Sequence, residues 1–318
     1  MISPRNARRR EVIPSAVMMA RSVDPAAVAR PIEALRWSAA MTEVKDVTGT
    51  AFVVAEFRAR ENDEPHPLYL DRVVPIFLED RTKRAADAIA AGFPAADMNV
   101  RIRTRYFDDR LDEQLANGCR QVVILGSGLD TRGVRKQTPG VAYFEIDDPS
   151  TISFKQARLA ERGFDAPIHF IAANYVASGV VPLLVANGFD CGLPSFFIWE
   201  GNTMYLTGPA VMTVLRDLRN RVPALAISFD SMDTAVVACT TGEVGATGFV
   251  ERFAAMGAPW TYGIDDLGAL ARATGMMVAD AVTVGDLHRK FWPERPPGSI
   301  IYDHYTLCTL VPDAAAKA

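Results

Sequence analysis

Short runs of consecutive apolar residues recur through the middle of the chain, separated by segments of helical periodicity. The runs lie at residues 121–125, 141–146, 168–172, 195–199 and 224–229, while residues 149–162, 176–187 and 208–221 have the pattern of amphipathic helices. Apolar runs without polar alternation are typical of strands that are covered on both faces. The alternation therefore predicts an α/β fold with a buried, mainly parallel sheet and helices on both of its faces.

The segments that flank this region follow other patterns. Residues 48–61, 68–81 and 83–91 predict helices, and a long helix is expected from about 100 to 117, before Gly118. Residues 231–265 interrupt the alternation of strands and helices, which indicates an insertion. Polar and apolar positions alternate from 302 to 311, so we expect a last strand at a sheet edge or in a hairpin.

The first 45 residues are basic and then rich in alanine. A cluster at 8–10 of three arginines precedes an apolar stretch at 12–20, but this stretch is short, contains Pro14 and has no A-x-A cleavage site after it. We therefore predict a mobile arm or a first helix rather than a signal peptide, with helix after Pro31. No window approaches the roughly 18 uncharged apolar residues of a membrane-spanning helix, so no membrane partner is expected.

Composition narrows the classes of function. The chain has 318 residues, of which 49% are hydrophobic and 23% charged, and its formal net charge is −4. It lacks the basic field that nucleic-acid binding requires, so no nucleic-acid partner is expected. The four cysteines and four histidines show no CxxC, HExxH or HxH spacing, which argues against a disulfide framework and a metal site. Unpaired cysteines favour a cytoplasmic location; the oligomeric state is left open.

A glycine loop follows the first predicted strand. Gly126 and Gly128, in the segment GSGLDT, let the backbone turn tightly and approach a ligand closely. The dinucleotide fingerprint GxGxxG fails because Thr131 occupies the third glycine position, and the loop has no GxxxxGK phosphate cradle. S-adenosylmethionine (SAM) has no pyrophosphate, so a glycine loop of this kind favours SAM over NAD.

Acidic residues follow the second and fourth predicted strands. Asp147 comes about 20 residues after the glycine loop, the usual position of a carboxylate that binds a ribose diol. The alternative is that Asp147 or Asp148 caps the helix that begins at Pro149. Glu145 shares a strand face with Asp147. Glu200 follows the fourth strand, where the cleft of an α/β sheet is expected.

At these residues the chain resembles the leucine carboxyl methyltransferase family, in its bacterial branch. The matching segments, in family order, are TGTAFVVAEFRARE (48–61), RTRYFDD (103–109), RQVVILGSGLDTRGVR (120–135), YFEIDDP with FK (143–155), FFIWEGNTMYL (196–206) and GAPWTYG (257–263). The resemblance implies a Rossmann-like SAM-dependent methyltransferase fold with a mostly parallel seven-stranded sheet, N-terminal helices and an inserted lid. It also implies SAM as the cofactor.

The resemblance assigns several residues to the amino-acid portion of SAM. Arg103 matches the arginine that pairs with the carboxylate of SAM, a task that suits the fork of a guanidinium group. Gly126 matches the glycine under the amino-acid portion, with Ser127 and Gly128 beside it. Glu200 matches the acid that faces the amino group.

The remaining assignments concern the nucleoside portion and the loop. Asp147 matches the ribose acid of the family. Asn174, followed by Tyr175, stands where the family usually has aspartate near the adenine. Asp130 and Arg132 are expected to shape the loop through a cap and an ion pair. Arg58 lies in the helix that corresponds to the one carrying a lysine in eukaryotic members, which has no clear match here.

The methyl acceptor is expected to bind between the N-terminal helices and the 231–265 insertion. Met232, Met256, Trp260 and Tyr262 give this insertion apolar and aromatic content that suits a small organic acceptor, or the insertion's own core. A carboxylate acceptor needs no general base, whereas a phenol would gain from one. No His–Asp pair is evident for that role, and the catalytic residues stay unknown.

Tyr205, His304 and Tyr305 are candidate catalytic residues, although they equally suit packing at a sheet edge or in the core. The function that we expect is transfer of a methyl group from SAM to a carboxylate or hydroxyl of a small molecule. The alternatives are a protein C-terminal carboxyl methyltransferase and a non-catalytic SAM-fold binding protein. The expected organisation is an N-terminal arm and helical cap (1–117), a SAM-binding core (118–230), a lid (231–265) and a C-terminal completion of the sheet (266–318).

Overall fold

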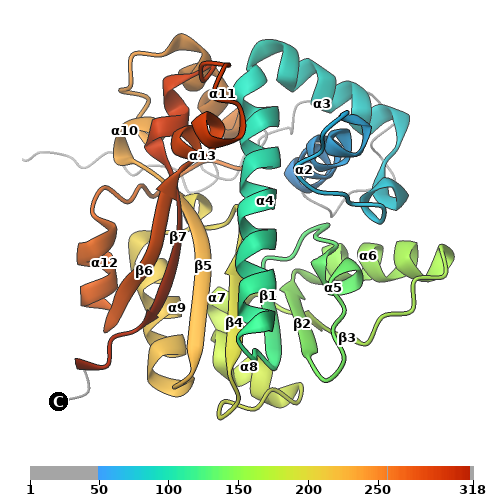
Figure 1. Ribbon diagram of the computed structural model, residues 1–318, viewed down its shortest axis with the longest axis vertical. Coiled ribbons are helices and arrows are strands. Elements are labelled where there is room, and N and C mark those ends of the chain that lie inside the picture. The colour runs from blue at the N-terminus through green and yellow to red at the C-terminus, as the bar shows by residue number, and fades with distance from the viewer. Residues whose placement is uncertain (1–48, 256, 316–318) are drawn as a thin grey trace, which may run out of the picture. The chain divides into compact units, whose positions relative to one another are not determined.

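The computed structural model describes residues 49–255 and 257–315, which contain seven strands in one sheet (Figure 1). The strands are β1 (Gln121–Leu125), β2 (Ala142–Asp147), β3 (Ile168–Ala172), β4 (Ser195–Trp199), β5 (Leu225–Met232), β6 (Met276–Thr283) and β7 (Tyr305–Pro312). Their order across the sheet is β3-β2-β1-β4-β5-β7-β6. The first five strands are parallel, whereas β7 runs antiparallel to β5 and β6. The expected mostly parallel, seven-stranded sheet is confirmed.

Helices pack against the sheet and around its carboxyl end. The helices, with η for short 3₁₀ turns, are α2 (Gly49–Arg60), η2 (Glu61–Asp63), η3 (Val74–Phe77), α3 (Asp80–Gly92), α4 (Pro94–Ala116), α5 (Arg132–Arg135), α6 (Pro149–Glu161), α7 (Tyr175–Ser178), α8 (Val180–Ala186), η4 (Thr203–Tyr205), α9 (Gly208–Arg221), α10 (Thr234–Val237), α11 (Val244–Ala255), α12 (Leu267–Ala273), α13 (Val284–Phe291) and η5 (Ile300–His304). In Figure 1 the long helix α4 crosses in front of the sheet, and α8 and α9 lie behind it.

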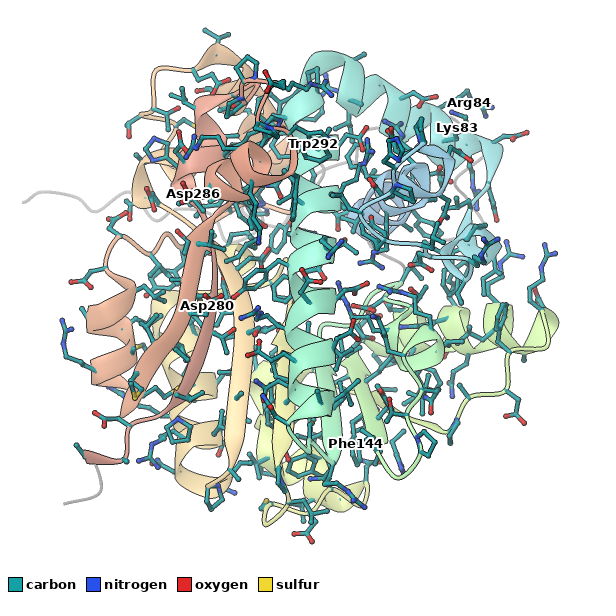
Figure 2. The ribbon with its side chains drawn as sticks, in the orientation of Figure 1. Lys83, Arg84, Phe144, Asp280, Asp286 and Trp292 are labelled. Carbon is teal, nitrogen blue, oxygen red and sulfur yellow. The ribbon has the colours of Figure 1, made fainter. Side chains whose placement is uncertain are left out.

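The two faces of the sheet bury alternate side chains of each central strand. In β1, Val122 and Ile124 pack in the cluster that contains α4 and α13, while Val123 and Leu125 pack in the cluster of α8, α9 and α12. Side chains fill the space between these layers (Figure 2). Because both faces are covered, the central strands are largely apolar, which explains why they stand out in the sequence as runs of apolar residues.

Most of the expected elements are present with nearly the expected bounds. The strands at 121–125, 168–172 and 195–199 match residue for residue, and the helix at 208–221 does as well. The helix expected at 176–187 is divided into α7 and α8 because Gly179 adopts a left-handed conformation with φ of 81°. The long helix α4 begins earlier than expected, at Pro94, a residue type that is favoured in the first helical turn.

One expectation was wrong, and of the two alternatives for the last strand only one holds. Residues 68–81 contain a 3₁₀ turn, η3, instead of a helix, because the Asp71 side chain accepts hydrogen bonds from the backbone of Val73 and Val74 and so forms a turn there. The last strand, β7, is not at the edge of the sheet but lies between β5 and β6; its antiparallel pairing with β6, the preceding strand of the chain, agrees with the alternative of a hairpin partner. The edge on this side of the sheet is formed by β6, a strand that the sequence analysis missed, and the other edge by β3. The residues of β6 alternate between buried or half-buried and exposed positions, and Asp280 interrupts its apolar residues.

The remaining expectations concern the N-terminal arm, the expected lid and membrane-spanning helices. The predicted arm and the helix after Pro31 lie outside the described residues, as does Met256. The segment expected as a lid leaves the sheet after Met232, where β5 ends, and contains α10 and α11. Within 49–255 and 257–315, no helix combines the length and the apolar character needed to cross a membrane.

Candidate active site

A cavity of about 680 Å³ lies at the carboxyl ends of the parallel strands. Gly126 after β1, Asp147 at the end of β2, Glu200 after β4 and Met232 at the end of β5 all line it. β1 lies between β2 and β4, so the chain order of the strands reverses at this point of the sheet. α/β proteins bind their ligands at such a switch point.

The glycine loop depends on close packing that only glycine permits. Gly126 and Gly128 have φ angles of +60° and +47°, in the left-handed region. A Cβ on Gly126 would lie 2.1 Å from Oδ1 of Asn202. The Asn202 side chain is held in this position because its Nδ2 donates to the Glu200 carbonyl at 2.8 Å. Asn202 therefore supports the loop from the neighbouring strand end.

The two acids after β2 have separate roles. Asp148 caps α6, since its Oδ1 accepts from the backbone nitrogens of Ser150 and Thr151 at 2.9 and 3.2 Å. Asp147 does not cap the helix: its Oδ2 accepts from the Gly128 nitrogen at 2.6 Å, and its Oδ1 from the Asp148 nitrogen at 2.7 Å. Burial raises the pKa of Asp147 to about 6, although these two hydrogen bonds oppose the rise.

Arg103 extends from α4 into a buried set of acids. Its Nε donates to Glu200 Oε1 at 3.0 Å, and its Nη1 to the Tyr305 hydroxyl at 2.8 Å and to Asp230 Oδ2 at 3.3 Å. Burial disfavours the charge of Arg103, but Tyr305, Glu200 and Asp230 together hold its pKa above the ordinary value. Its Nη2 lies beside Gly201 and makes no hydrogen bond to the described part of the chain.

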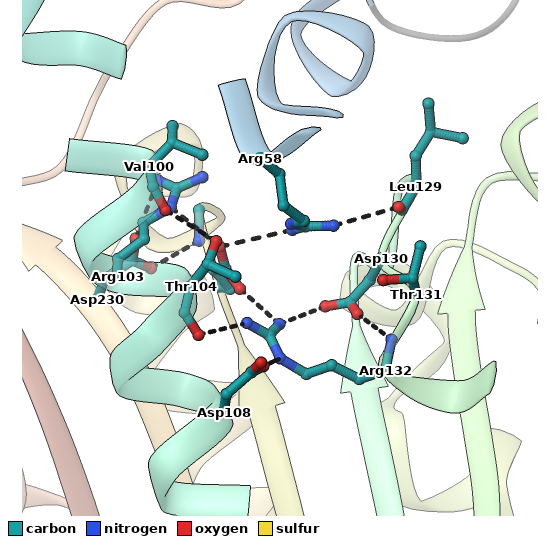
Figure 3. A network of polar contacts seen from close by, with 12 residues as sticks. Arg58, Val100, Arg103, Thr104, Asp108, Leu129, Asp130, Thr131, Arg132 and Asp230 are labelled. Atoms are coloured by element: carbon teal, nitrogen blue, oxygen red, sulfur yellow. Dashed lines mark hydrogen bonds and ion pairs between the residues drawn. The ribbon is translucent and has the colours of Figure 1, made fainter. Parts of the chain in front are cut away.

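A second arginine locks the loop to α4 and β4 (Figure 3). Arg132 is fully buried, and its Nη1 lies 2.5 Å from Asp130 Oδ2 and 2.6 Å from Glu200 Oε2, while its Nε lies 2.7 Å from Asp108 Oδ1. The Asp130 carboxylate also accepts from the Arg132 backbone nitrogen at 2.7 Å. The expectation that Asp130 and Arg132 shape the loop through a cap and an ion pair is confirmed.

Arg58 of α2 completes this network from the opposite side (Figure 3). Its Nη1 donates to the Leu129 carbonyl at 3.2 Å, its Nη2 lies 3.8 Å from Glu200 Oε1, and its buried Nε has no hydrogen-bond partner among the residues that the structure describes. Burial opposes the charge of Glu200, but Arg132, Arg103 and Arg58 keep its pKa below the ordinary value. Carboxylates outnumber guanidinium groups in the connected set of Arg58, Arg103, Arg132, Arg135, Asp71, Asp108, Asp130, Glu200 and Asp230. The set therefore favours a ligand that carries positive charge.

The expected adenine residues also lie at the cavity. Asn174 is the N-cap of α7, and its Oδ1 already accepts from the Val176 and Ala177 nitrogens at 3.1 Å each. Tyr175 is buried, and its hydroxyl accepts from Trp199 Nε1 at 3.0 Å. Ser127 also lines the cavity, and its buried hydroxyl has no hydrogen-bond partner within the described part of the chain.

The three catalytic candidates have different positions. Tyr205 and Tyr305 line the cavity, and burial raises the pKa of both hydroxyls, so neither ionises easily. His304 does not line the cavity. Its Nδ1 lies 2.8 Å from Asp233 Oδ2, a pair that the sequence analysis missed because β5 and β7 bring the two residues together across the sheet.

Asp230 is a further residue that the sequence analysis missed. It lies in β5, one position beyond the expected end of that strand, and contacts Arg103, Tyr305 and the Gly201 nitrogen. The rule that was applied to the earlier strands, that polar residues at a strand's carboxyl end face the ligand site, would have identified it.

The other side of the cavity is apolar. Its wall contains the rings of Phe57, Phe93, Phe249, Phe253 and Trp260 and the side chains of Met204 and Met232. We call this wall the ring-lined chamber. Of the residues that were expected to form an acceptor pocket, Met232 and Trp260 belong to it. Tyr262 does not line the cavity but packs against Gly208.

Comparisons with known proteins agree with this geometry. The model of the leucine carboxyl methyltransferase family matches residues 51–219. A Frankia alni protein, whose name describes an S-adenosyl-L-methionine-dependent methyltransferase, is 31% identical over 226 residues, or 68% of this chain and 75% of that protein. A Mycobacterium ulcerans protein with the same description is 36% identical over 172 residues, or 50% of this chain and 57% of that protein.

Solved structures share the fold at low sequence identity. A methyltransferase structure from Thermobifida fusca has a TM-score of 0.57 at 15% identity, and the match covers 86% of this chain and 98% of that one. A structure of a DUF574 family protein from Streptomyces avermitilis has a TM-score of 0.56 at 13% identity and covers 81% of this chain and 97% of the other. The expected Rossmann-like methyltransferase fold is confirmed.

Proposed function

The chain belongs to the leucine carboxyl methyltransferase family and is a SAM-dependent methyltransferase, and from this premise we propose that it methylates a carboxylate or hydroxyl oxygen of a small organic molecule. When bound, SAM supplies an electrophilic methyl group on a sulfonium. The protein's own task is to hold the cofactor and the acceptor in line and to exclude water.

The observation that carries this proposal is the pair of charged groups on either side of the glycine loop. Asp147 presents a buried carboxylate at one end, and Arg103 presents an Nη2 without a partner among the described residues at the other. A carboxylate suits the two hydroxyls of a ribose, and a guanidinium nitrogen suits the carboxylate of an amino acid. The surplus of carboxylates in the network suits the positive charge of SAM.

The residues around the acceptor support oxygen methylation without a strong base. Tyr205 and Tyr305 have pKa values raised by burial, and His304 lies outside the cavity. A carboxylate acceptor is already ionised near neutral pH and loses no proton when it is methylated. The ring-lined chamber supplies the apolar surroundings in which a small acceptor is separated from water.

Calorimetric titration of SAM into the purified protein tests the cofactor, with NAD as the control. We expect SAM to bind with a micromolar Kd and NAD to give no heat of binding. A protein that binds NAD and not SAM would overturn the proposal. Once SAM binding is established, transfer of labelled methyl groups to a panel of aromatic and aliphatic acids and phenols tests the acceptor.

A further inference from the structure

The ring-lined chamber contains a donor that the protein itself does not satisfy. Trp260 is 9% exposed, and its buried Nε1 has no hydrogen-bond acceptor in the described structure. The indole lies near the Tyr205 hydroxyl. Burial raises the pKa of Tyr205 and the nearby indole opposes this rise, but the two groups do not form a hydrogen bond of normal geometry. A buried N–H without a partner is costly, so it points to a ligand that brings an acceptor atom.

The position of Trp260 relative to the cofactor side is fixed by the backbone. The nitrogen of Thr261, the next residue, donates to the Met204 carbonyl at 2.7 Å, and its hydroxyl donates to the Leu206 carbonyl at 2.9 Å. Met204 belongs to η4, which directly follows the segment of Glu200 and its loop. The indole is therefore attached to the same strand end as the acid that pairs with Arg103.

A second polar side chain lines the cavity nearby. Asn99 lies one helical turn before Arg103 on α4 and is 8% exposed, yet its amide forms no hydrogen bond within the described ranges. Ala95 and Ala96, one further turn away, also line the cavity and leave it open because their side chains are small. Asn99 therefore lies between Arg103 on the cofactor side and the start of α4 on the chamber side.

The aromatic side chains of the chamber contact one another as rings do in a protein core. Phe249 lies 5.1 Å from Phe93, 4.6 Å from Phe253 and 5.6 Å from Trp260, measured between ring centroids. Flat rings and polarisable methionine sulfurs favour another flat ring as their neighbour. A peptide would bring several backbone N–H and C=O groups, and apart from Trp260, Tyr205 and Asn99 the described chamber offers them few partners.

We propose that the ring-lined chamber binds the methyl acceptor as a flat aromatic molecule with an oxygen substituent, and that this oxygen accepts the Trp260 Nε1 hydrogen while Asn99 contacts the polar edge on the cofactor side. The inference rests on the proposed function. Transfer forms an oxygen–carbon bond and breaks the carbon–sulfur bond, whose electron pair stays on sulfur; a carboxylate loses no proton, and a phenol releases its proton to water.

Nuclear magnetic resonance of the tryptophan indoles tests this assignment. Full-length protein labelled with ¹⁵N-tryptophan and saturated with S-adenosylhomocysteine is titrated with 2-naphthoate, 2-naphthol or naphthalene. We expect both oxygen-bearing probes, but not naphthalene, to shift the Trp260 indole proton downfield, as a new hydrogen bond does. The resonance is assigned by its absence in Trp260→Phe.

Variants separate this proposal from the proposed function. Trp260→Phe keeps a ring but removes the donor, so we expect 2-naphthoate to bind about tenfold more weakly while the SAM affinity is unchanged. Trp292→Phe, at the end of α13 and outside the cavity, is the matched control and should change neither (Figure 2). Should Trp260→Phe fail to fold, Asn99→Ala serves instead, with an expected loss of a few-fold.

Two results would overturn the inference but not the proposed function. One is that the Trp260 and Asn99 variants bind 2-naphthoate as tightly as the unmodified protein does. The other is that the unmodified protein binds SAM but neither oxygen-bearing probe. Displacement of 2-naphthoate by a short peptide of equal affinity, acting through its C-terminal carboxylate, would assign the chamber to a peptide and overturn it too. Loss of SAM binding in the unmodified protein would instead contradict the proposed function.

Discussion

The Asp147 carboxylate accepts a hydrogen bond from the backbone nitrogen of Gly128 at 2.6 Å. This contact joins the end of β2 to the glycine loop after β1, and it leaves the acid buried with its pKa raised to about 6 by burial. The buried charge of Asp147 destabilises the folded protein, but it can form hydrogen bonds to a bound ligand. Replacing Asp147 should therefore change both ligand binding and the free energy of unfolding.

Asp147→Asn should weaken SAM binding about tenfold at pH 7.5, because a neutral amide is a poorer partner for two ribose hydroxyls than a carboxylate. In the unmodified protein the affinity should increase as the pH rises through about 6 and Asp147 loses its proton. Calorimetry between pH 5 and 8 measures both effects. A variant with the same affinity and the same pH dependence would show that Asp147 does not contact the cofactor.

The same substitution should stabilise the free protein above pH 6. Because the folded pKa is raised from 3.8 to about 6, the stability that protonation contributes is complete below pH 3.8 and is lost as the pH rises through 6. The shift corresponds to about 2–3 kcal/mol, and the variant loses about 1 kcal/mol of hydrogen bonding to the Asp148 nitrogen. Urea unfolding should therefore show a gain of about 1–2 kcal/mol at pH 7.5 and none at pH 4.5.

The fold could be predicted where local pattern and burial agree. Strands β1 and β4 were predicted to the residue because both are buried apolar runs between helix layers, and β3, at the sheet edge, was predicted to the residue because no turn residue interrupts it. Strand β6 was missed although MMVADAVT is mostly apolar, because Asp280 interrupts its apolar residues and alternate side chains are exposed at the sheet edge. The turn at 68–78 was predicted as helix because the competing contact, from the Asp71 carboxylate to its own backbone, leaves no periodicity in the sequence.

The site was predictable in its residues but not in their pairing. The spacing of Asp147 predicted that it lies near the glycine loop, and the family resemblance predicted that Arg103 and Glu200 line the same site. Neither could indicate that Arg103 bonds Glu200 at 3.0 Å and shares Asp230 with Tyr305, because these residues come from α4, β4, β5 and β7. Contacts between distant elements depend on the sheet order, which no local pattern records.

Arg103→Lys should reduce SAM affinity at least tenfold. A lysine keeps the positive charge, but its single nitrogen cannot serve Glu200, Asp230 and a cofactor carboxylate in the planar geometry of a guanidinium group. Arg216→Lys is the matched control, because Arg216 is exposed and, of the residues that the structure describes, it bonds only the Ala273 carbonyl. Calorimetric titration of SAM into both variants measures the difference. If the two variants bound SAM with comparable affinity, Arg103 would not contact the cofactor.

Gly126→Ala should destabilise the protein by about 3 kcal/mol, because a Cβ would lie 2.1 Å from Asn202 Oδ1 and the residue has φ of +60°. Gly163→Ala is a control for the backbone conformation alone, since Gly163 has φ of +72° and nothing lies within 4 Å of a Cβ there. It should cost only about 1 kcal/mol. Urea unfolding compares the two, and equal losses would mean that Asn202 moves aside freely.

Lys155→Met should destabilise the protein by about 3–5 kcal/mol at pH 7.5, because it leaves Glu145 buried without its partner. Both side chains are fully buried, and burial already raises the pKa of Glu145 even with Lys155 beside it. The double variant Glu145→Gln with Lys155→Met should recover most of that loss, since no charge is then buried. Lys136→Met, which breaks the exposed contact with Asp112, should cost at most about 1 kcal/mol. If urea unfolding gave Lys155→Met no larger loss than Lys136→Met, the buried pair would not anchor α6 to β2.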